Sequence, residues 1–443
     1  MKSTTDLERW RKAIKEARVL KSTGFVTRVI GLTIEARGIK ARIGEVCDIL
    51  VPGEAQPVKA EVVGFREDAS LLMPLGELRG IYPGCNITPT GNSLTIKVGG
   101  HLQGKVLDGL GCPLSGTKGE ALDGETYPVD NKPPNPLARK PIREVLATGV
   151  RAIDSLLTCG RGQRIGIFAG SGVGKSTLLG MIARYSDADA NVIALIGERG
   201  REVLDFIETD LGLDGLARSV VVAATSDQPA LVRLKGAFVA SAIAEYYRDQ
   251  GKNVLLLMDS VTRFAMAQRE VGLAIGEPPA TKGYTPSVFA MLPKLLEKSG
   301  TSSGGSITAF YTVLVDGDDM NEPIADAVRG ILDGHIVLSR DLAARNQYPA
   351  IETLSSVSRL MPDLTTQEHQ RQASNLREML ATYKEAEDLI NIGAYVVGSN
   401  PKIDRAIRYN DQIIGFLRQD VGELCSYDET LARLAGIGEE RHV

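Results

Sequence analysis

A glycine-rich turn in the middle of the chain constrains the fold more than any other segment. Residues 163–168 form a short run with few charges that predicts a β-strand, and a helical pattern begins near Lys175. The turn between them reads Ala-Gly-Ser-Gly-Val-Gly. Alternating glycines let several backbone N–H groups point toward one anion, and the dipole of the following helix favours negative charge there. The segment therefore predicts a strand–turn–helix cradle for phosphate.

The side chains of this turn match the Walker A motif, G-x-x-x-x-G-K-[ST], which binds nucleotide phosphates. Lys175 should reach the β- and γ-phosphates, and the Ser176 hydroxyl should ligate Mg²⁺. The first glycine of the motif is replaced by Ala169, which fits if its backbone keeps a negative φ. We therefore predict ATP and Mg²⁺ as cofactors. The predicted nucleotide-binding residues here are Ala169, Gly170, Ser171, Gly172, Val173, Gly174, Lys175, Ser176 and Thr177.

Two carboxylates follow predicted strands at the edge of the sheet that holds this turn. Asp259 ends the apolar segment 254–258, and we expect it to hold Mg²⁺ through water, the alternative being a helix N-cap. Glu198 follows the segment 194–197. Hydrolysis needs a carboxylate that polarises the attacking water, so Glu198 is the predicted base. The alternative is that Glu198 and Arg199 only begin a solvated helix.

The pattern of apolar and turn-forming residues changes along the chain, which predicts separate domains. Residues 23–98 alternate short apolar runs with Gly, Pro and Asn, which predicts a small antiparallel β-domain, a barrel. A proline-rich joint follows at 130–141. Residues 99–361 then alternate strands with helices, which predicts a parallel α/β core, and residues 362–443 are typical of a helical domain. The predicted core strands are 163–168, 191–196, 219–224, 253–258 and 306–313, with a helix over 229–250.

An amphipathic helix is predicted near the N-terminus, within residues 1–22. Leu7, Trp10, Ile14 and Ala17 recur at helical spacing with charges between them. Two roles remain open: a docking helix for a partner, and a helix that rests on its own domain.

Composition narrows the class of protein. The formal net charge is −4, from 51 basic and 55 acidic residues without a long single-sign run, which gives no electrostatic footprint for nucleic acid. No stretch approaches the ~18 apolar residues of a membrane span, and residues 1–20 lack the apolar core of a signal peptide. Five scattered cysteines and four histidines disfavour a zinc site and favour reduced thiols in the cytoplasm.

With these features in hand, the chain resembles the catalytic subunits of the rotary ATP synthase superfamily. Within that superfamily it resembles the ATPases of type III protein export. The resemblance is carried by residues 160–183, 106–111 and 318–326, and it extends from about residue 23 to about residue 420. It implies a RecA-like P-loop core with an N-terminal β-barrel and a C-terminal helical domain.

Three further segments resemble the flagellar branch of these ATPases, the flagellum-specific ATP synthases. They are residues 64–66, 71–76 and 392–401. The resemblance implies an ATP-hydrolysing motor that drives export of flagellar building blocks. The alternatives are an injectisome secretion ATPase, a subunit of the proton-driven ATP synthase, a hexameric nucleic-acid translocase of the transcription-terminator type, and a purely structural nucleotide binder.

The resemblance also assigns two residues in the segment 348–359. In the superfamily, the aromatic at the position of Tyr348 stacks on adenine, and the arginine at Arg359 reaches across a subunit interface to the γ-phosphate. The family usually has Asp or Asn where this chain has Glu352. A surface salt bridge is the alternative role for Arg359. The predicted catalytic residues are Lys175, Glu198, Arg199, Asp259 and Arg359.

One chain carries both Glu198 and Arg359, so a single gene product can build a ring in which every interface is competent. The resemblance implies a homohexamer. It also implies a stator-like partner at the N-terminal helix and a coiled-coil stalk partner at the loop 276–284, for which a plain surface turn is the alternative. Export gate, chaperones and export substrates complete the implied partners, without nucleic acid. The implied location is the cytoplasm, peripheral at the inner membrane.

Overall fold

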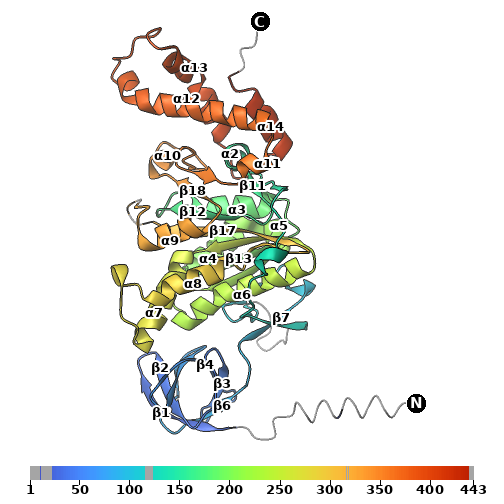
Figure 1. The fold of residues 1–443 in the computed structure, drawn as a ribbon, viewed down its shortest axis with the longest axis vertical. Helices are drawn as coiled ribbons and strands as arrows, with labels where there is room; N and C mark the ends of the chain where they lie inside the picture. Colours follow the sequence, from blue (N-terminus) through green and yellow to red (C-terminus); the bar gives the residue numbers. More distant parts are fainter. Residues whose placement is uncertain (1–9, 11–21, 115–122, 316, 318, 439–443) are drawn as a thin grey trace, which may run out of the picture. The chain divides into compact units, whose positions relative to one another are not determined.

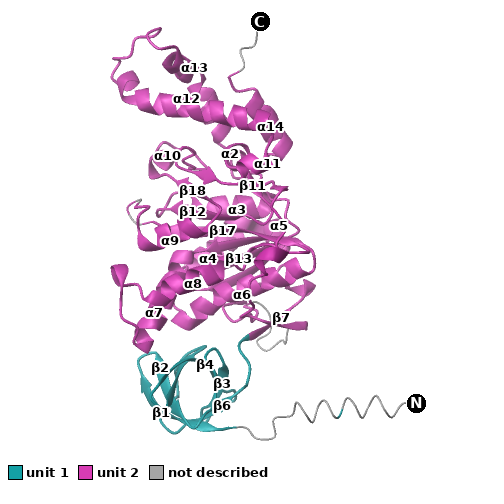
Figure 2. Ribbon diagram, in the orientation of Figure 1, with its two compact units in different colours: residues 1–94 teal, residues 95–443 magenta. Residues whose placement is uncertain are grey.

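The computed structural model describes residues 10, 22–114, 123–315, 317 and 319–438. The chain divides into two compact units, residues 1–94 and 95–443, which Figure 2 draws in different colours. The helix predicted within residues 1–22 lies outside the described residues, apart from positions 10 and 22.

The first unit contains a closed antiparallel barrel (Figure 1) with the strand order β1-β2-β5-β4-β3-β6. Its strands are β1 (Gly24–Ile30), β2 (Thr33–Arg37), β3 (Val46–Leu50), β4 (Val58–Arg66), β5 (Ala69–Pro74) and β6 (Asn86–Pro89). Aliphatic side chains such as Ile34, Ile49, Val62 and Ile87 fill the interior. Closure leaves no free strand edge, and it confirms the predicted barrel.

The second unit is built on a mainly parallel sheet with the order β19-β18-β12-β17-β15-β13-β14-β8. These strands are β8 (Val106–Asp108), β12 (Arg164–Ala169), β13 (Ala190–Ile196), β14 (Ser219–Ala224), β15 (Asn253–Asp259), β17 (Ser306–Leu314), β18 (Gly334–Leu338) and β19 (Val357–Ser358). The central strands are buried along nearly their whole length, as strands covered on both faces must be. All five predicted core strands are present, whereas β8, β18 and β19 were not predicted.

Parallel pairing brings the C-terminal ends of the central strands to one edge of the sheet. Ala169 of β12 lies opposite Leu314 of β17, and Leu195 of β13 lies opposite Asp259 of β15. Helices α3 (Lys175–Tyr185), α6 (Ala230–Asp249), α7 (Val261–Ile275), α8 (Pro286–Leu296) and α9 (Pro323–Ile331) accompany the strands. The long helix α6 matches the predicted 229–250 helix and packs on β13, β14 and β15.

Three helices near the C-terminus belong to the same compact unit as the sheet. They are α12 (Gln367–Asn391), α13 (Pro401–Leu417) and α14 (Tyr427–Ala435). α12 packs along α13, and α14 packs on α2 (Arg151–Leu156), which precedes the glycine-rich turn. The side chain of Arg151 is buried and donates to the carbonyl of Phe416, which ties the end of α13 to the core.

Short elements complete the second unit. A two-stranded sheet pairs β7 (Thr95–Val98) with β9 (Glu125–Pro128). The others are η1 (Gly100–Leu102), η2 (Pro136–Ala138), β10 (Val145–Leu146), β11 (Cys159–Gly160), α4 (Gly200–Asp205), η3 (Phe206–Leu211), α5 (Gly212–Ala217), η4 (Thr281–Gly283), β16 (Gly300–Thr301), α10 (Arg340–Ala344) and α11 (Met361–Leu364). The domain limits 23–98, 99–361 and 362–443 stay predictions.

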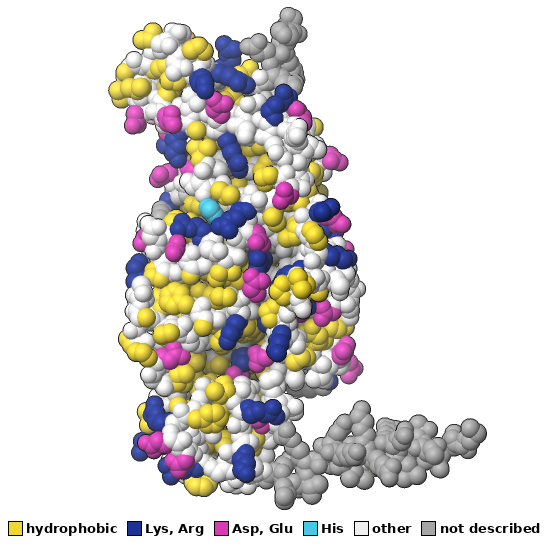
Figure 3. Space-filling model, in the orientation of Figure 1, with side chains coloured by type: hydrophobic (Ala, Val, Ile, Leu, Met, Phe, Trp, Pro, Cys, Tyr) yellow, Lys and Arg dark blue, Asp and Glu magenta, His cyan; other side chains and the backbone are white. Residues whose placement is uncertain are grey.

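Surface composition agrees with the balanced charge of the sequence. On the face drawn in Figure 3, basic and acidic side chains are interspersed among the residues described. Within the same residues, no helix is long and apolar enough to cross a lipid bilayer. The five cysteines are free thiols.

Candidate functional site

The glycine-rich turn adopts a backbone that only glycine accommodates at several positions. Gly172 and Gly174 have φ values of 79° and 83°, a region that side chains with a Cβ rarely adopt. A Cβ on Gly170 would come within 2.6 Å of a guanidinium nitrogen of Arg340. Ala169, in contrast, ends β12 in strand conformation, so alanine fits there. We call residues 169–174 the P-loop from here on.

The P-loop lysine lies between two carboxylates at the C-terminal edge of the sheet. Lys175 Nζ donates to Asp259 Oδ1 over 2.5 Å, and Glu198 Oε1 is 3.8 Å from the same nitrogen. The three side chains come from α3, the end of β15 and the turn after β13. Parallel strand pairing therefore unites groups that are far apart in the sequence.

Asp259 is held in place by its neighbour strand rather than used as a helix cap. Thr312 of β17 donates its hydroxyl proton to Asp259 Oδ1 over 2.7 Å. The cap of α7 is Ser260, whose Oγ accepts from the backbone N–H of Arg263 over 3.3 Å. The carboxylate of Asp259 thus remains directed at Lys175.

Glu198 has the features of a group that can take up a proton. Burial, followed by the negative charge of Asp259, raises the pKa of Glu198 to about 7, against the opposing effect of Lys175. Its Oε1 is buried without a hydrogen-bond partner in the structure. A carboxylate with a pKa near neutrality and a free oxygen can accept a proton from water.

A cavity of about 460 Å³ surrounds these groups. It is lined by the P-loop together with Lys175, Ser176 and Thr177, by Glu198 and Arg199, and by Asp259 and Arg263. Arg199 is largely exposed and pairs with Glu202 at 3.5 Å. Arg263 was not predicted from the sequence; its Cβ lies close to Gly197, and its positive charge acts on Glu198.

A second cavity, of about 640 Å³, opens on the other side of the P-loop. Tyr348 lines it, and its ring lies so close to Gly174 that a Cβ there would be 3.4 Å from two ring carbons. Residues of the segment 418–423, which follows α13, also line this cavity, and the N–H of Gln419 donates to the carbonyl of Tyr348 over 2.9 Å. This segment was not predicted as part of the site, because it reaches the cavity through packing between distant parts of the chain.

Arg359 lies apart from the phosphate cavity of its own chain. It follows β19, which pairs with the N-terminal end of β18 through Gly334 and Ser358. The C-terminal end of β18, at Leu338, lies beside Ala169 at the P-loop. Arg359 therefore lies at the edge of the sheet opposite to the P-loop, exposed, with Nη2 donating to the carbonyl of Arg329 over 3.4 Å.

Family comparisons match the chain almost end to end. Residues 149–358 match the nucleotide-binding domain of the ATP synthase alpha/beta family, residues 26–91 match its beta-barrel domain, and residues 365–436 match the C-terminal domain of the type III secretion ATPase EscN. The flagellum-specific ATP synthase of Bacillus subtilis (strain 168) is 59% identical over 94% of this chain and 95% of its own length. This chain belongs to the flagellar and type III secretion ATPases of the ATP synthase alpha/beta family.

Other members of the family agree in sequence and fold. The type 3 secretion system ATPase of Xanthomonas euvesicatoria is 51% identical over 94% of both chains. The structure of the assembled ATPase EscN from enteropathogenic E. coli superposes with a TM-score of 0.88 at 48% identity, over 94% of this chain and 100% of that one. The same ATPase has also been solved in complex with its central stalk EscO. The predicted RecA-like core, barrel and helical domain are those of this ATPase family.

Oxygen donors near Lys175 have the chemistry that a magnesium ion requires. The Ser176 hydroxyl and the Asp259 carboxylate are hard oxygen ligands of the kind Mg²⁺ prefers. In the described part of the chain, no three His, Cys, Asp or Glu side chains gather into a metal site of their own. A Mg²⁺ ion held here would therefore take most of its ligands from phosphate oxygens and water.

Proposed function

We propose that this chain is the ATP-hydrolysing motor of the flagellar type III protein export apparatus. The family membership supports ATP hydrolysis, and the 59% identity to a flagellum-specific ATP synthase supports the flagellar role. The observation that carries the chemistry is the union of Lys175, Glu198 and Asp259 in one cavity beside the P-loop. The export gate, chaperones and flagellar building blocks are the proposed partners, with the chain peripheral at the cytoplasmic face of the inner membrane.

The residues of the cavity divide the chemistry among them. The P-loop amides and Lys175 bind and orient the terminal phosphates, and Glu198 accepts a proton from the attacking water. A Mg²⁺ ion, held by Ser176 and Asp259, supplies charge neutralisation when bound. Tyr348 offers an aromatic face for adenine in the neighbouring cavity.

Arg359 supports a ring in which each site is completed by the next protomer. Its position opposite to its own P-loop edge leaves it free to reach a neighbour's phosphate cavity. An arginine supplied in trans contributes roughly 10³–10⁵ to the rate in comparable phosphoryl-transfer sites. We propose a homohexamer, in keeping with the assembled state named for EscN.

Two further contacts of the ring are proposed. The loop 276–284 follows α7, and its residues 278–282 are exposed, so a coiled-coil stalk could bind there; EscN was solved with a central stalk. The segment 1–22 is proposed as the docking site of a stator-like partner.

Deletion of the gene in its own organism tests the role. We expect non-motile cells without an external filament, rescued by the wild-type chain but not by Glu198→Gln. A second candidate, an injectisome ATPase, is favoured by the 51% identity to a type 3 secretion system ATPase. Motile cells that lose secretion of other proteins would support that candidate instead. Stimulation of the ATPase by RNA or DNA would overturn both in favour of a nucleic-acid translocase.

Mixing of two inactive variants tests the arginine in trans. Glu198→Gln protomers lack the base but keep Arg359, whereas Arg359→Ala protomers keep the base. In randomly mixed rings at equal amounts, about one quarter of interfaces combine an intact base with an intact arginine. We therefore expect turnover to reappear on mixing, and no recovery at any ratio would contradict the model.

A further inference from the structure

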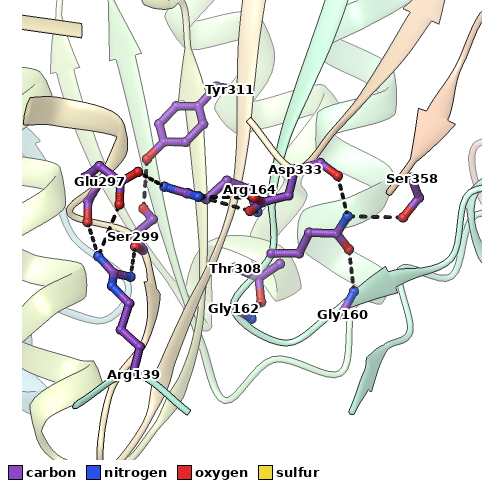
Figure 4. A network of polar contacts seen from close by, with 11 residues as sticks. Arg139, Gly160, Gly162, Arg164, Glu297, Ser299, Thr308, Tyr311, Asp333 and Ser358 are labelled. Atoms are coloured by element: carbon purple, nitrogen blue, oxygen red, sulfur yellow. Dashed lines mark hydrogen bonds and ion pairs between the residues drawn. The ribbon is translucent and has the colours of Figure 1, made fainter. Parts of the chain in front are cut away.

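A buried polar network lies at the end of β12 that is remote from the P-loop (Figure 4). Its central residue is Gln163, which has no exposed surface. Gln163 Oε1 accepts from the N–H of Gly160 over 2.8 Å. Its Nε2 donates to the carbonyl of Asp333 over 3.2 Å and to Ser358 Oγ over 3.1 Å. Both polar ends of this amide are therefore used, and one of them holds the residue next to Arg359.

The backbone of Arg359 is tied to the same group of residues. Its N–H donates to the carbonyl of Asp333 over 3.1 Å, the carbonyl that also accepts from Gln163. The Asp333 carboxylate is in turn held by Arg164, which donates Nε to Oδ2 over 3.0 Å and Nη2 to Oδ1 over 3.1 Å. Gln163, just before β12, and Arg164, its first residue, thus help to fix the path of the chain as it reaches Arg359.

Within β19 itself few other contacts hold the chain, although the buried Ser356 just before it accepts from the N–H of Val337 over 2.9 Å. β19 has only two residues and pairs with the sheet on one side alone. Val357 is 45% exposed, and Arg359 is exposed as well. The Ser358 hydroxyl is the side chain that turns inward, donating to the carbonyl of Thr158 over 2.8 Å while accepting from Gln163. The two hydrogen bonds of the Ser358 hydroxyl are therefore the main inward side-chain contacts of this two-residue strand.

We propose that Gln163 and Ser358 are positioning residues for the arginine that each protomer gives to its neighbour. The proposal rests on the ring with Arg359 in trans. Rate acceleration by such an arginine depends on where its guanidinium lies, and a displacement of about 1 Å can cost on the order of 10²-fold. A hydrogen bond between Gln163 and Ser358 limits that displacement from inside the donor protomer.

The rest of the network continues away from Arg359 and offers a matched control. Thr308 Oγ1 accepts from the N–H of Gly162 over 2.8 Å, one residue before Gln163. This hydrogen bond is buried, like that of Gln163, yet it does not reach β19. Thr308→Val removes it with little change in shape.

The kinetics of four variants test the positioning role. Gln163→Leu and Ser358→Ala should each lower kcat by roughly tenfold to a hundredfold. Their KM for ATP should stay within about twofold, because the arginine acts in the transition state. Ser358→Thr keeps the hydroxyl and should restore kcat, and Thr308→Val should behave as wild type. A raised KM with an unchanged kcat, or an equal loss in Thr308→Val, would overturn the proposal.

Mixed rings then locate the defect. Gln163→Leu protomers have an intact base and a misplaced arginine, so mixing them with Glu198→Gln protomers should restore turnover. Mixing Lys175→Ala with Glu198→Gln should not, since both defects lie in the protomer's own site. If Gln163→Leu does not fold, Ser358→Ala takes its place in the same mixture.

The mixtures separate two kinds of failure. When Arg359→Ala with Glu198→Gln recovers but Gln163→Leu or Ser358→Ala with Glu198→Gln does not, the positioning role is wrong and the ring with Arg359 in trans stands. When neither mixture recovers, the arginine in trans itself is wrong, and the positioning role falls with it.

Discussion

Lys175 Nζ and Asp259 Oδ1 form an ion pair of 2.5 Å at the mouth of the P-loop. Both side chains are largely buried, at 13% and 6% exposed, so solvent screens the pair weakly. The ammonium that should hold the terminal phosphates is therefore already paired with a carboxylate. Nucleotide has to compete with Asp259 for this lysine.

The variant Asp259→Asn tests whether Asp259 competes with nucleotide for Lys175. Without the carboxylate, Lys175 is free for phosphate and one repulsive charge is gone, so nucleotide binding in the presence of EDTA should tighten by about tenfold, or ~1.4 kcal/mol. Hydrolysis with Mg²⁺ should be lost. Titration with a fluorescent ADP analogue in EDTA measures nucleotide binding by the wild-type protein and by the variant. Thr312→Val removes the hydroxyl that donates to Asp259 and to the carbonyl of Met258 but keeps the charge of Asp259, so nucleotide binding should not tighten.

Glu198 should cause the pH profile of kcat/KM to fall on the acidic side of about pH 7. Its pKa is raised to about 7 by burial and by Asp259, so in the free enzyme the base is protonated below pH 7 and ionised above it. We expect kcat/KM for ATP to rise with pH through about 7 and to level off above it. A profile that is flat down to pH 5 would contradict the assignment of Glu198 as the base. Glu198→Gln should retain binding, lose turnover by roughly 10²–10⁴-fold above pH 7, and no longer show the rise with pH.

Tyr348 should matter through its ring rather than its hydroxyl. The ring lies against Gly174 in the cavity beside the P-loop. Stacking of a base on an aromatic side chain contributes about 1–3 kcal/mol. Tyr348→Ala should therefore weaken ADP binding by roughly tenfold to a hundredfold, whereas Tyr348→Phe should bind like wild type. Equal losses in both variants would point to a hydroxyl contact instead of stacking.

Arg151 should control the stability of the wall formed by residues 418–423. It is 3% exposed, pairs with Glu423, and donates to the carbonyls of Phe416 and Arg418. Arg151→Met removes the buried donor to both carbonyls and one of the two ion-pair partners of Glu423. We therefore expect the free energy of unfolding to fall by about 3 kcal/mol, the Tm to fall by roughly 5 °C, and nucleotide binding to weaken. Arg433 pairs with the same Glu423 from the surface, and Arg433→Ala should cost less than about 0.5 kcal/mol. A comparable Tm loss in both variants would show that burial is not the cause.

The P-loop and the two carboxylates could be predicted from the sequence because short local patterns determine them. The P-loop residues are consecutive, and their glycines and lysine have recognisable roles in any chain. Asp259 and Glu198 could be placed because parallel strands end at one edge of a sheet, whatever the rest of the fold does. The five core strands were found for a similar reason, since long aliphatic runs are hard to mistake.

Long-range packing accounts for what was missed. The wall at 418–423 and the charge of Arg263 reach the site through contacts that no local pattern encodes. β18 has five residues and β19 has two, so neither carries an apolar run long enough to be recognised as a strand. Tyr348 and Arg359 could be assigned only by family resemblance, because both lie in irregular segments.

The length of β18 separates Arg359 from the P-loop of its own chain, so on the proposed ring a solitary protomer lacks an arginine at its own phosphate cavity. On the proposed ring, specific activity depends on concentration, because dilution removes the arginine from every centre at once. Assembly is then the switch of this enzyme. A freshly synthesised protomer that diffuses alone consumes little ATP until its neighbours arrive.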